Sequence, residues 1–183
     1  MAIKTFTTGE VLTAADTNTY LANSGLVFVK SQSVTASSGT TAVSDAFSAT
    51  YDAYRIVVTN GAVSVGNANI DCLVGGATTG YDNGGIYFGS AATGGLGGTN
   101  QGSFSFAGEG TTNYISCCFE LQNPFLAKQT LFQSSPAFNT SNANSRINAG
   151  VLTNTTSYTA FTLTLSSGTF TTGTITVYGY RKA

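Results

Sequence analysis

The side chains best suited to acid–base chemistry in this chain are carboxylates, because its 183 residues include no histidine. Asp71, Asp82, Glu109 and Glu120 fall in the central half of the sequence. Two carboxylates at a fixed separation can act as general acid and base, as in glycoside hydrolysis. The sequence singles out no such pair, and Glu120 falls on the outward face of its expected strand. We therefore interpret the acids as solvated surface groups and expect no enzymatic activity.

The cysteines offer little further chemistry. Cys117 and Cys118 are neighbours and would point to opposite faces of a strand, so we expect no disulfide framework. Cys72 and Cys117 are interpreted as buried, reduced thiols. Three cysteines without histidine fall short of the four ligands of a structural zinc site. Asp-Asn-Gly at 82–84 resembles the start of a calcium loop but lacks its later ligands. We expect neither a metal nor a cofactor.

A glycine-rich segment from Thr78 to Gly102 is the candidate recognition region. A phosphate-binding loop would need a strand before it and a helix after it, whereas the strand-like sequence SFSFAG follows here. We predict a long surface loop with a short hairpin around residues 86–88. Long loops on a rigid β-scaffold commonly carry binding. The candidate contact residues are Tyr81, Asp82, Asn83 and Tyr87.

The elements that must position these residues are strands, because apolar and polar side chains alternate along much of the chain. Such alternation is typical of antiparallel strands with one face on a core. The apolar faces are expected at Tyr54, Ile56 and Val58; at Ile70, Cys72 and Val74; at Ile115, Cys117, Phe119 and Leu121; at Phe161, Leu163 and Leu165; and at Ile175 and Val177.

Strands that recur without intervening helices favour an all-β domain over residues 26–183, an antiparallel β-sandwich that is jelly-roll-like. The order along the chain does not separate a jelly roll from another Greek-key sandwich. Polar residues 134–150 are predicted to form a second loop.

Composition limits the partners of the chain. Charged residues make up only 8%, and the net charge is -1. Nucleic-acid binding requires clustered Lys and Arg, and the seven basic residues are scattered, so no nucleic-acid partner is expected. No apolar run has the length of a membrane span, so no membrane insertion is expected. A nearly neutral surface tends to associate, which favours a chain that spends much of its surface against other protein.

Residues 1–25 differ from the rest and are predicted to form an extended arm and a short helix. Thr13 is a suitable N-cap, Asp16 gives a near-match to a capping box, and the helix is expected over residues 14–22. So short a helix is not stable alone. The segment therefore either caps its own domain or docks on another subunit, and the residues leave both alternatives open. The residues expected to make its contacts are Ile3, Phe6, Val11, Leu12, Tyr20 and Leu21.

Three segments carry a resemblance to a known group of proteins. KTFTTGEVLTAADTNTYLANSGLVFV at the start, TYDAYRIVVTN, and GTFTTGTITVYGYRK at the end resemble small virion proteins of tailed bacteriophages, the tail fibre or minor tail proteins. The resemblance implies a β-sandwich knob, commonly a homotrimer, attached to other virion proteins through its N-terminal segment. It also implies assembly in the host cytoplasm.

The expected function is therefore a structural virion protein, a short tail fibre or tail appendage that contacts the host surface. No heptads, collagen-like repeats or β-helix period supply a fibre shaft. A capsid decoration or cement protein is the first alternative. A carbohydrate-binding module, in which Tyr81, Asp82, Asn83 and Tyr87 contact a host surface glycan, is the second.

Overall fold

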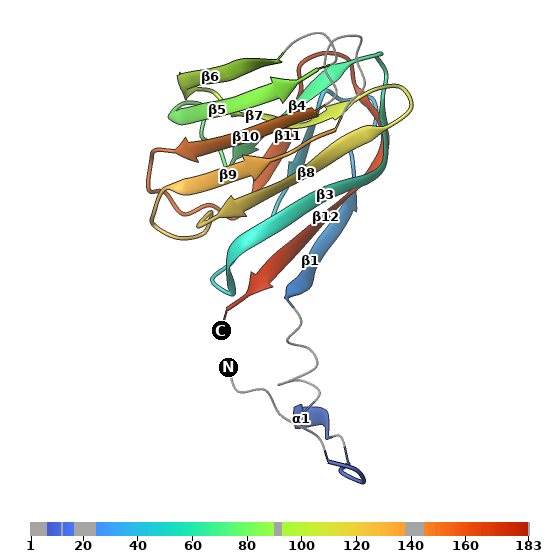
Figure 1. Cartoon of the computed structure of the whole chain (residues 1–183), viewed down its shortest axis with the longest axis vertical. Coiled ribbons are helices and arrows are strands. Elements are labelled where there is room, and N and C mark those ends of the chain that lie inside the picture. Colours follow the sequence, from blue (N-terminus) through green and yellow to red (C-terminus); the bar gives the residue numbers. More distant parts are fainter. Residues whose placement is uncertain (1–6, 12, 17–24, 90–92, 138–144, 183) are drawn as a thin grey trace.

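The computed structural model describes residues 7–11, 13–16, 25–89, 93–137 and 145–182, and strands dominate them (Figure 1). One helical turn, α1 (Ala14–Asp16), precedes them. The strands are β1 (Leu26–Ser33), β2 (Thr40–Val43), β3 (Tyr51–Val63), β4 (Ala68–Val74), β5 (Tyr81–Phe88), β6 (Thr93–Gln101), β7 (Phe104–Gly110), β8 (Ile115–Gln122), β9 (Thr130–Ser134), β10 (Ser145–Leu152), β11 (Phe161–Leu165) and β12 (Phe170–Arg181).

All strands join one curled antiparallel sheet, which confirms the predicted all-β class. Strand β8 is the branch point: one of its edges pairs with β3, which continues to β12 and β1. Its other edge pairs first with β7 and then with β9. One branch runs β7-β4-β11-β2 and the other β9-β10-β5-β6. The sheet thereby curls around its own inner face, where the core lies (Figure 1).

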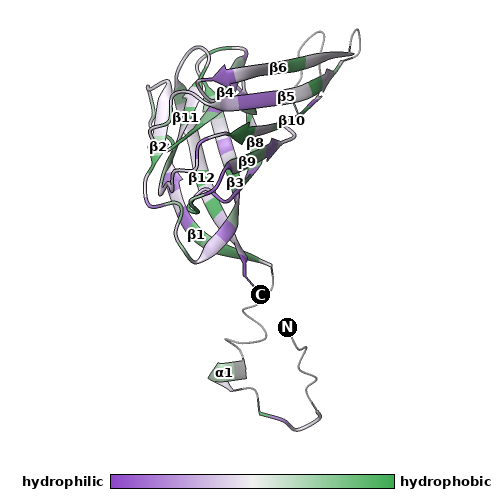
Figure 2. Cartoon of the chain, turned by 90° about the vertical axis from the view of Figure 1, so that its left-hand side faces the viewer, coloured by the Kyte–Doolittle hydropathy of each residue, from purple (hydrophilic) through white to green (hydrophobic). Residues whose placement is uncertain are grey.

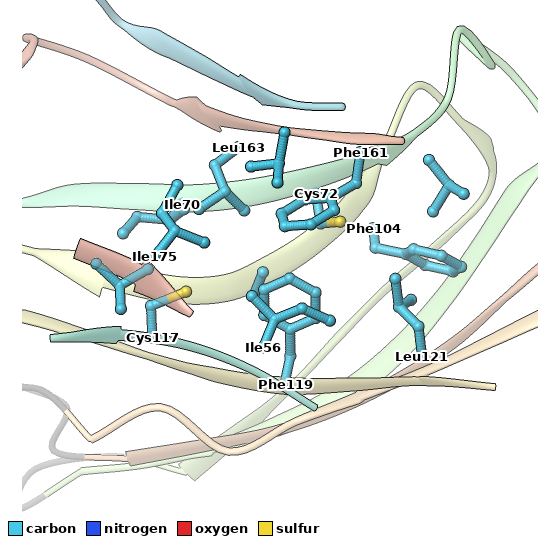
Figure 3. Close-up of a cluster of buried hydrophobic side chains, with 14 of the residues drawn as sticks. Ile56, Ile70, Cys72, Phe104, Cys117, Phe119, Leu121, Phe161, Leu163 and Ile175 are labelled. Carbon is cyan, nitrogen blue, oxygen red and sulfur yellow. The ribbon is translucent and has the colours of Figure 1, made fainter. Parts of the chain in front are cut away.

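The core consists of the apolar faces that period-two alternation predicts. Of those faces every member is buried except Ile115, which is half-buried and packs against the rest. Figure 3 shows side chains from different strands meeting in one cluster, among them Phe104, Phe119 and Phe161. Cys72 and Cys117 are buried free thiols in this cluster, as predicted. Burial raises the pKa of both thiols, so they remain protonated and act as small apolar groups.

Two predicted loops are strands instead. Most of residues 78–102 form the hairpin β5–β6. Its two strands pair regularly, from Asn83 opposite Gly98 to Phe88 opposite Thr93. Part of residues 134–150 forms β10, which pairs with both β9 and β5. Glycine and asparagine have low intrinsic strand propensity, but pairing with neighbouring strands overrides it. Composition alone was therefore a poor guide to these segments.

The predicted helix over residues 14–22 is not seen. Only the turn α1 is helical, and residues 17–22 lie outside the described part of the chain. Three residues cannot form a stable helix by themselves. Strand β1 begins at Leu26, directly after the predicted arm.

Candidate functional site

The β5–β6 hairpin, the predicted recognition region, forms the end of the sheet opposite the N-terminal arm. Figure 1 and Figure 2 both place β5 and β6 at the top and α1 at the bottom. Among the described residues, strand pairing joins the hairpin to the rest of the sheet through β5, which pairs with β10. Its inner face lies over β7, and this is where the polar side chains of the region gather.

The four predicted contact residues do not form one surface, because they alternate along β5. Tyr81 is buried, and its hydroxyl accepts a hydrogen bond from the Val74 N–H at 2.8 Å and donates to the Ala77 carbonyl at 3.2 Å. Burial raises the pKa of Tyr81. Asp82 points to the opposite side and accepts from the Asn100 N–H at 2.8 Å. Tyr81 is therefore a core residue and not a contact residue.

Asn83 and Tyr87 are the two candidates on the inner face of the hairpin. The Asn83 Nδ2 donates to the Ser103 carbonyl at 2.9 Å, and its Oδ1 is buried without a partner among the described residues. The Tyr87 ring lies over Gly94, where an added Cβ would come within 2.6 Å of it. Because glycine has no side chain, position 94 leaves room for the Tyr87 ring to lie directly on the backbone.

A cavity of about 160 Å³ lies between the inner face of the hairpin and β7. Its polar lining comes from Asn83, Gln101, Ser105 and Asn148, and its apolar wall from Leu96 and Phe106, among others. The amide nitrogens are already engaged: Gln101 donates to the Thr99 carbonyl at 2.9 Å and Asn148 to Ser134 Oγ at 3.4 Å. No lining residue is ionisable. The cavity can hold water or a small neutral molecule, but it has no group for acid–base chemistry.

A bulge in β7 shapes the floor of this cavity. The β4–β7 register shifts between Ile70 and Cys72, and Phe106 has a left-handed backbone with φ of 58°. That conformation is unfavourable for a bulky residue. Asp71 stabilises this backbone conformation, because its carboxylate accepts hydrogen bonds from the Phe106 N–H at 3.0 Å and from Ser103 Oγ at 3.1 Å. Ser134 Oγ donates to the Phe106 carbonyl at 2.7 Å.

A buried ion pair lies beside the bulge. Arg146 on β10 has its guanidinium 4.0 Å from the centre of the Phe106 ring and 3.7 Å from the Glu109 carboxylate. It also donates to Asn69 Oδ1 at 3.0 Å. The Glu109 side chain is only 1% exposed, and neither of its oxygens accepts a hydrogen bond within the described chain. Burial raises the pKa of Glu109, while the charge of Arg146 opposes that rise.

The fourth of the central acids, Glu120, lies on the outer face of β8. Arg55 approaches its carboxylate at 3.3 Å, and the Tyr180 hydroxyl donates a hydrogen bond to it. Each of Asp71, Asp82, Glu109 and Glu120 therefore has its own structural partner. Over the described ranges, no three His, Cys, Asp or Glu side chains group in a way that could hold a metal ion.

The N-terminal arm is described only in part. Ile3, Phe6, Leu12, Tyr20 and Leu21 lie outside the described residues. Val11 is 79% exposed, the highest value among the large apolar side chains that the structure describes. A tight turn precedes it, in which the Glu10 N–H donates to the Thr7 carbonyl at 3.0 Å.

Sequence reasoning did not identify Arg146, Asn148 and Phe106, which shape the cavity and the buried ion pair. The alternation in RINAGVL indicates a strand, but it points to the wrong face, because Asn148 is buried while Ile147 is 48% exposed. Proximity to the polar stretch before it concealed this strand pattern.

Comparison with known proteins adds no family to these observations. Within the described part of the chain, no helix is long and apolar enough to cross a membrane. No protein-family model, no curated protein and no solved structure matches this chain.

Proposed function

We propose that this chain is a structural virion protein of a tailed bacteriophage, a short tail-fibre or tail-appendage knob that its N-terminal arm anchors to other virion proteins. The observation that carries the proposal is the exposure of the arm. Residues 7–11 and 13–15 are all exposed, including Val11. An exposed apolar side chain on an arm gains free energy when a partner buries it.

The placement of the two ends supports an appendage. The arm lies at one end of the molecule and the β5–β6 hairpin at the other (Figure 1). In the proposed arrangement the arm end faces the particle and the hairpin end is directed away from it. The cavity has no ionisable lining residue, and the four central acids each have a structural partner in the fold, which supports a non-enzymatic role.

The finer architecture belongs to the same proposal. The branching of the sheet at β8 places β7-β4-β11-β2 and β9-β10-β5-β6 on one edge of a single strand. We assign this arrangement to a jelly-roll-like β-sandwich, with both branches covering one core. The knob is a homotrimer in this proposal, assembled in the reducing host cytoplasm, where Cys72 and Cys117 stay as thiols.

The arm is tested by substituting Phe6→Ser and Val11→Ser together in particles assembled in a host. Burying a Val or Phe side chain is worth about 1.5–3 kcal/mol. Loss of both contacts should weaken attachment roughly a hundredfold or more, so the variant should be missing from purified particles. Quantitative mass spectrometry of the particles measures its copy number.

A matched control is the Thr7→Ser, Thr8→Ser variant, which changes the same arm without removing a large apolar side chain. It should be incorporated like the wild type. Incorporation of the Phe6→Ser, Val11→Ser variant at the wild-type level would contradict the anchoring role. A wild-type copy number similar to that of the major capsid protein would instead favour the head-decoration alternative.

A further inference from the structure

The sheet has three open edges in the described part of the chain, and they differ in how they are protected. Strands β1, β2 and β6 each pair with a single neighbour. An open edge presents unpaired backbone N–H and C=O groups that can pair with another chain. Folded proteins usually block such edges with short strands, bulges, charges or covering side chains.

Two of the three edges are blocked in this way. Strand β2 has only four residues, and β1 side chains cover it: Gln32 Nε2 donates to the Ala42 carbonyl at 2.9 Å and Lys30 Nζ to the Ser44 carbonyl at 2.6 Å. Strand β1 is interrupted by a bulge between Phe28 and Lys30 and carries the charge of Lys30. Neither edge offers a long regular backbone.

The third edge, β6, is longer than β2 and carries no charge and no bulge over most of its length. Its nine residues, TGGLGGTNQ, contain no charge and no proline. The strand pairs regularly with β5 from Thr93 to Gly98, and its only register shift follows that stretch. Figure 1 and Figure 2 show β6 at the outer limit of the sheet. A regular, uncharged edge of this length is a template for strand addition.

We propose that the β6 edge binds the β6 edge of a second copy of this chain, antiparallel across a two-fold axis, so that two sheets become continuous. Strand addition normally gains specificity from pockets for alternate side chains. Four of the six residues in the regular stretch are glycine, so β6 has almost no side chains with which to recognise a foreign sequence. A two-fold axis instead matches each backbone group to its own counterpart.

The absence of charge on β6 also favours a second copy of this chain as the partner. Two β6 strands oppose no like charges, because neither carries any. The net charge of -1 allows two copies to approach without strong repulsion. The contact is independent of the N-terminal arm, which lies at the other end of the molecule (Figure 1). It therefore adds a pairing surface to any association that the arm mediates.

The test is a Gly95→Lys variant of the full chain, studied by sedimentation velocity at increasing concentration. Gly95 is exposed, and an added Cβ there meets no atom within 4 Å, so the lysine fits without disturbing β5. Across the two-fold axis it brings like charges together. The wild type should form particles with an even number of chains, two for the edge contact alone or six where it joins two trimers. Gly95→Lys should halve that number.

Two controls separate charge at the edge from other effects. Gly66→Lys adds the same charge at an equally open glycine in the β3–β4 turn and should leave the particle unchanged. Gly95→Thr adds bulk without charge and should retain pairing. Unchanged thermal unfolding by circular dichroism shows that each variant is folded. The proposal is overturned if the wild type stays a monomer up to millimolar concentration, if it has three chains, or if Gly95→Lys leaves its mass unchanged.

Discussion

An Arg146→Met variant is expected to lose about 3–5 kcal/mol of unfolding free energy at neutral pH, because it leaves a buried charge without its partner. Glu109 would keep its carboxylate in a site that is 1% exposed, with no hydrogen bond from the described residues. Methionine retains an apolar stem and a polarisable sulfur against the Phe106 ring, so most of the loss should come from the charge. Urea denaturation at pH 7 measures it.

The pH dependence of the lost unfolding free energy shows whether the buried charge or the packing is its cause. Burial raises the pKa of Glu109 in the folded state above its ordinary value near 4.5, and removing Arg146 removes the interaction that opposes this rise. Between the unfolded and folded pKa values the native state holds more protons than the unfolded state, so stability falls as pH rises through that window. Below the unfolded pKa the carboxyl is neutral in both states. The deficit relative to wild type should therefore shrink on acidification to about pH 4.

The double variant Arg146→Met, Glu109→Gln is the matched control. Glutamine removes the negative charge while keeping the size of the side chain, so most of the lost stability should return at pH 7. If the single variant loses the same free energy at both pH values, and the double variant recovers none of it, the loss arises from packing around Phe106. The ion pair would then contribute little.

The strand faces were the most predictable part of the fold. Residues 115–121 alternate so clearly that the buried side of β8 follows from the amino-acid pattern. Residues 54–58 of its partner β3, and residues 175–177 of β12 on the far side of β3, obey the same rule. Alternation succeeds there because one side of each strand faces the core and the other faces solvent. It also correctly assigned Cys72 and Cys117 to the core.

The candidate site was less predictable for a physical reason. In the β5–β6 hairpin, glycines stand where alternating apolar residues would normally indicate strands. Tyr81 was expected at the surface because tyrosine commonly occurs in recognition sites, but its hydroxyl finds backbone partners inside the core. The pairing of Arg146 with Glu109 joins residues far apart in the chain. Such a contact depends on tertiary register, which local patterns do not contain.

The aromatic cluster beneath the hairpin should be the most sensitive part of the core. A Phe104→Ala variant is expected to lose about 3–5 kcal/mol of unfolding free energy, as large-to-small aromatic substitutions in cores do. Phe104 is fully buried, stacks on Phe132 with ring centres 4.7 Å apart, and meets the edge of Tyr81 at 4.8 Å. It thus ties β7 to β9 and β5. Urea denaturation followed by circular dichroism measures the loss.

The size of that loss also depends on how far neighbouring groups can move into the space that the Phe104→Ala substitution leaves. The Phe104 ring lies against the bare backbone of Gly150, where an added Cβ would come within 2.9 Å of it. Glycine has no side chain to move into the space that alanine leaves, so relaxation on that side is limited and the loss should fall in the upper part of the range.

Phe88→Ala is the matched control, because Phe88 is 42% exposed on the outer face of β5. This variant should lose less than about 1.5 kcal/mol of unfolding free energy. Equal losses in the two variants would show that the ring at 104 does not organise the core. A larger loss at 104, together with faster amide exchange in β5, would show that the core holds the hairpin in place through Tyr81.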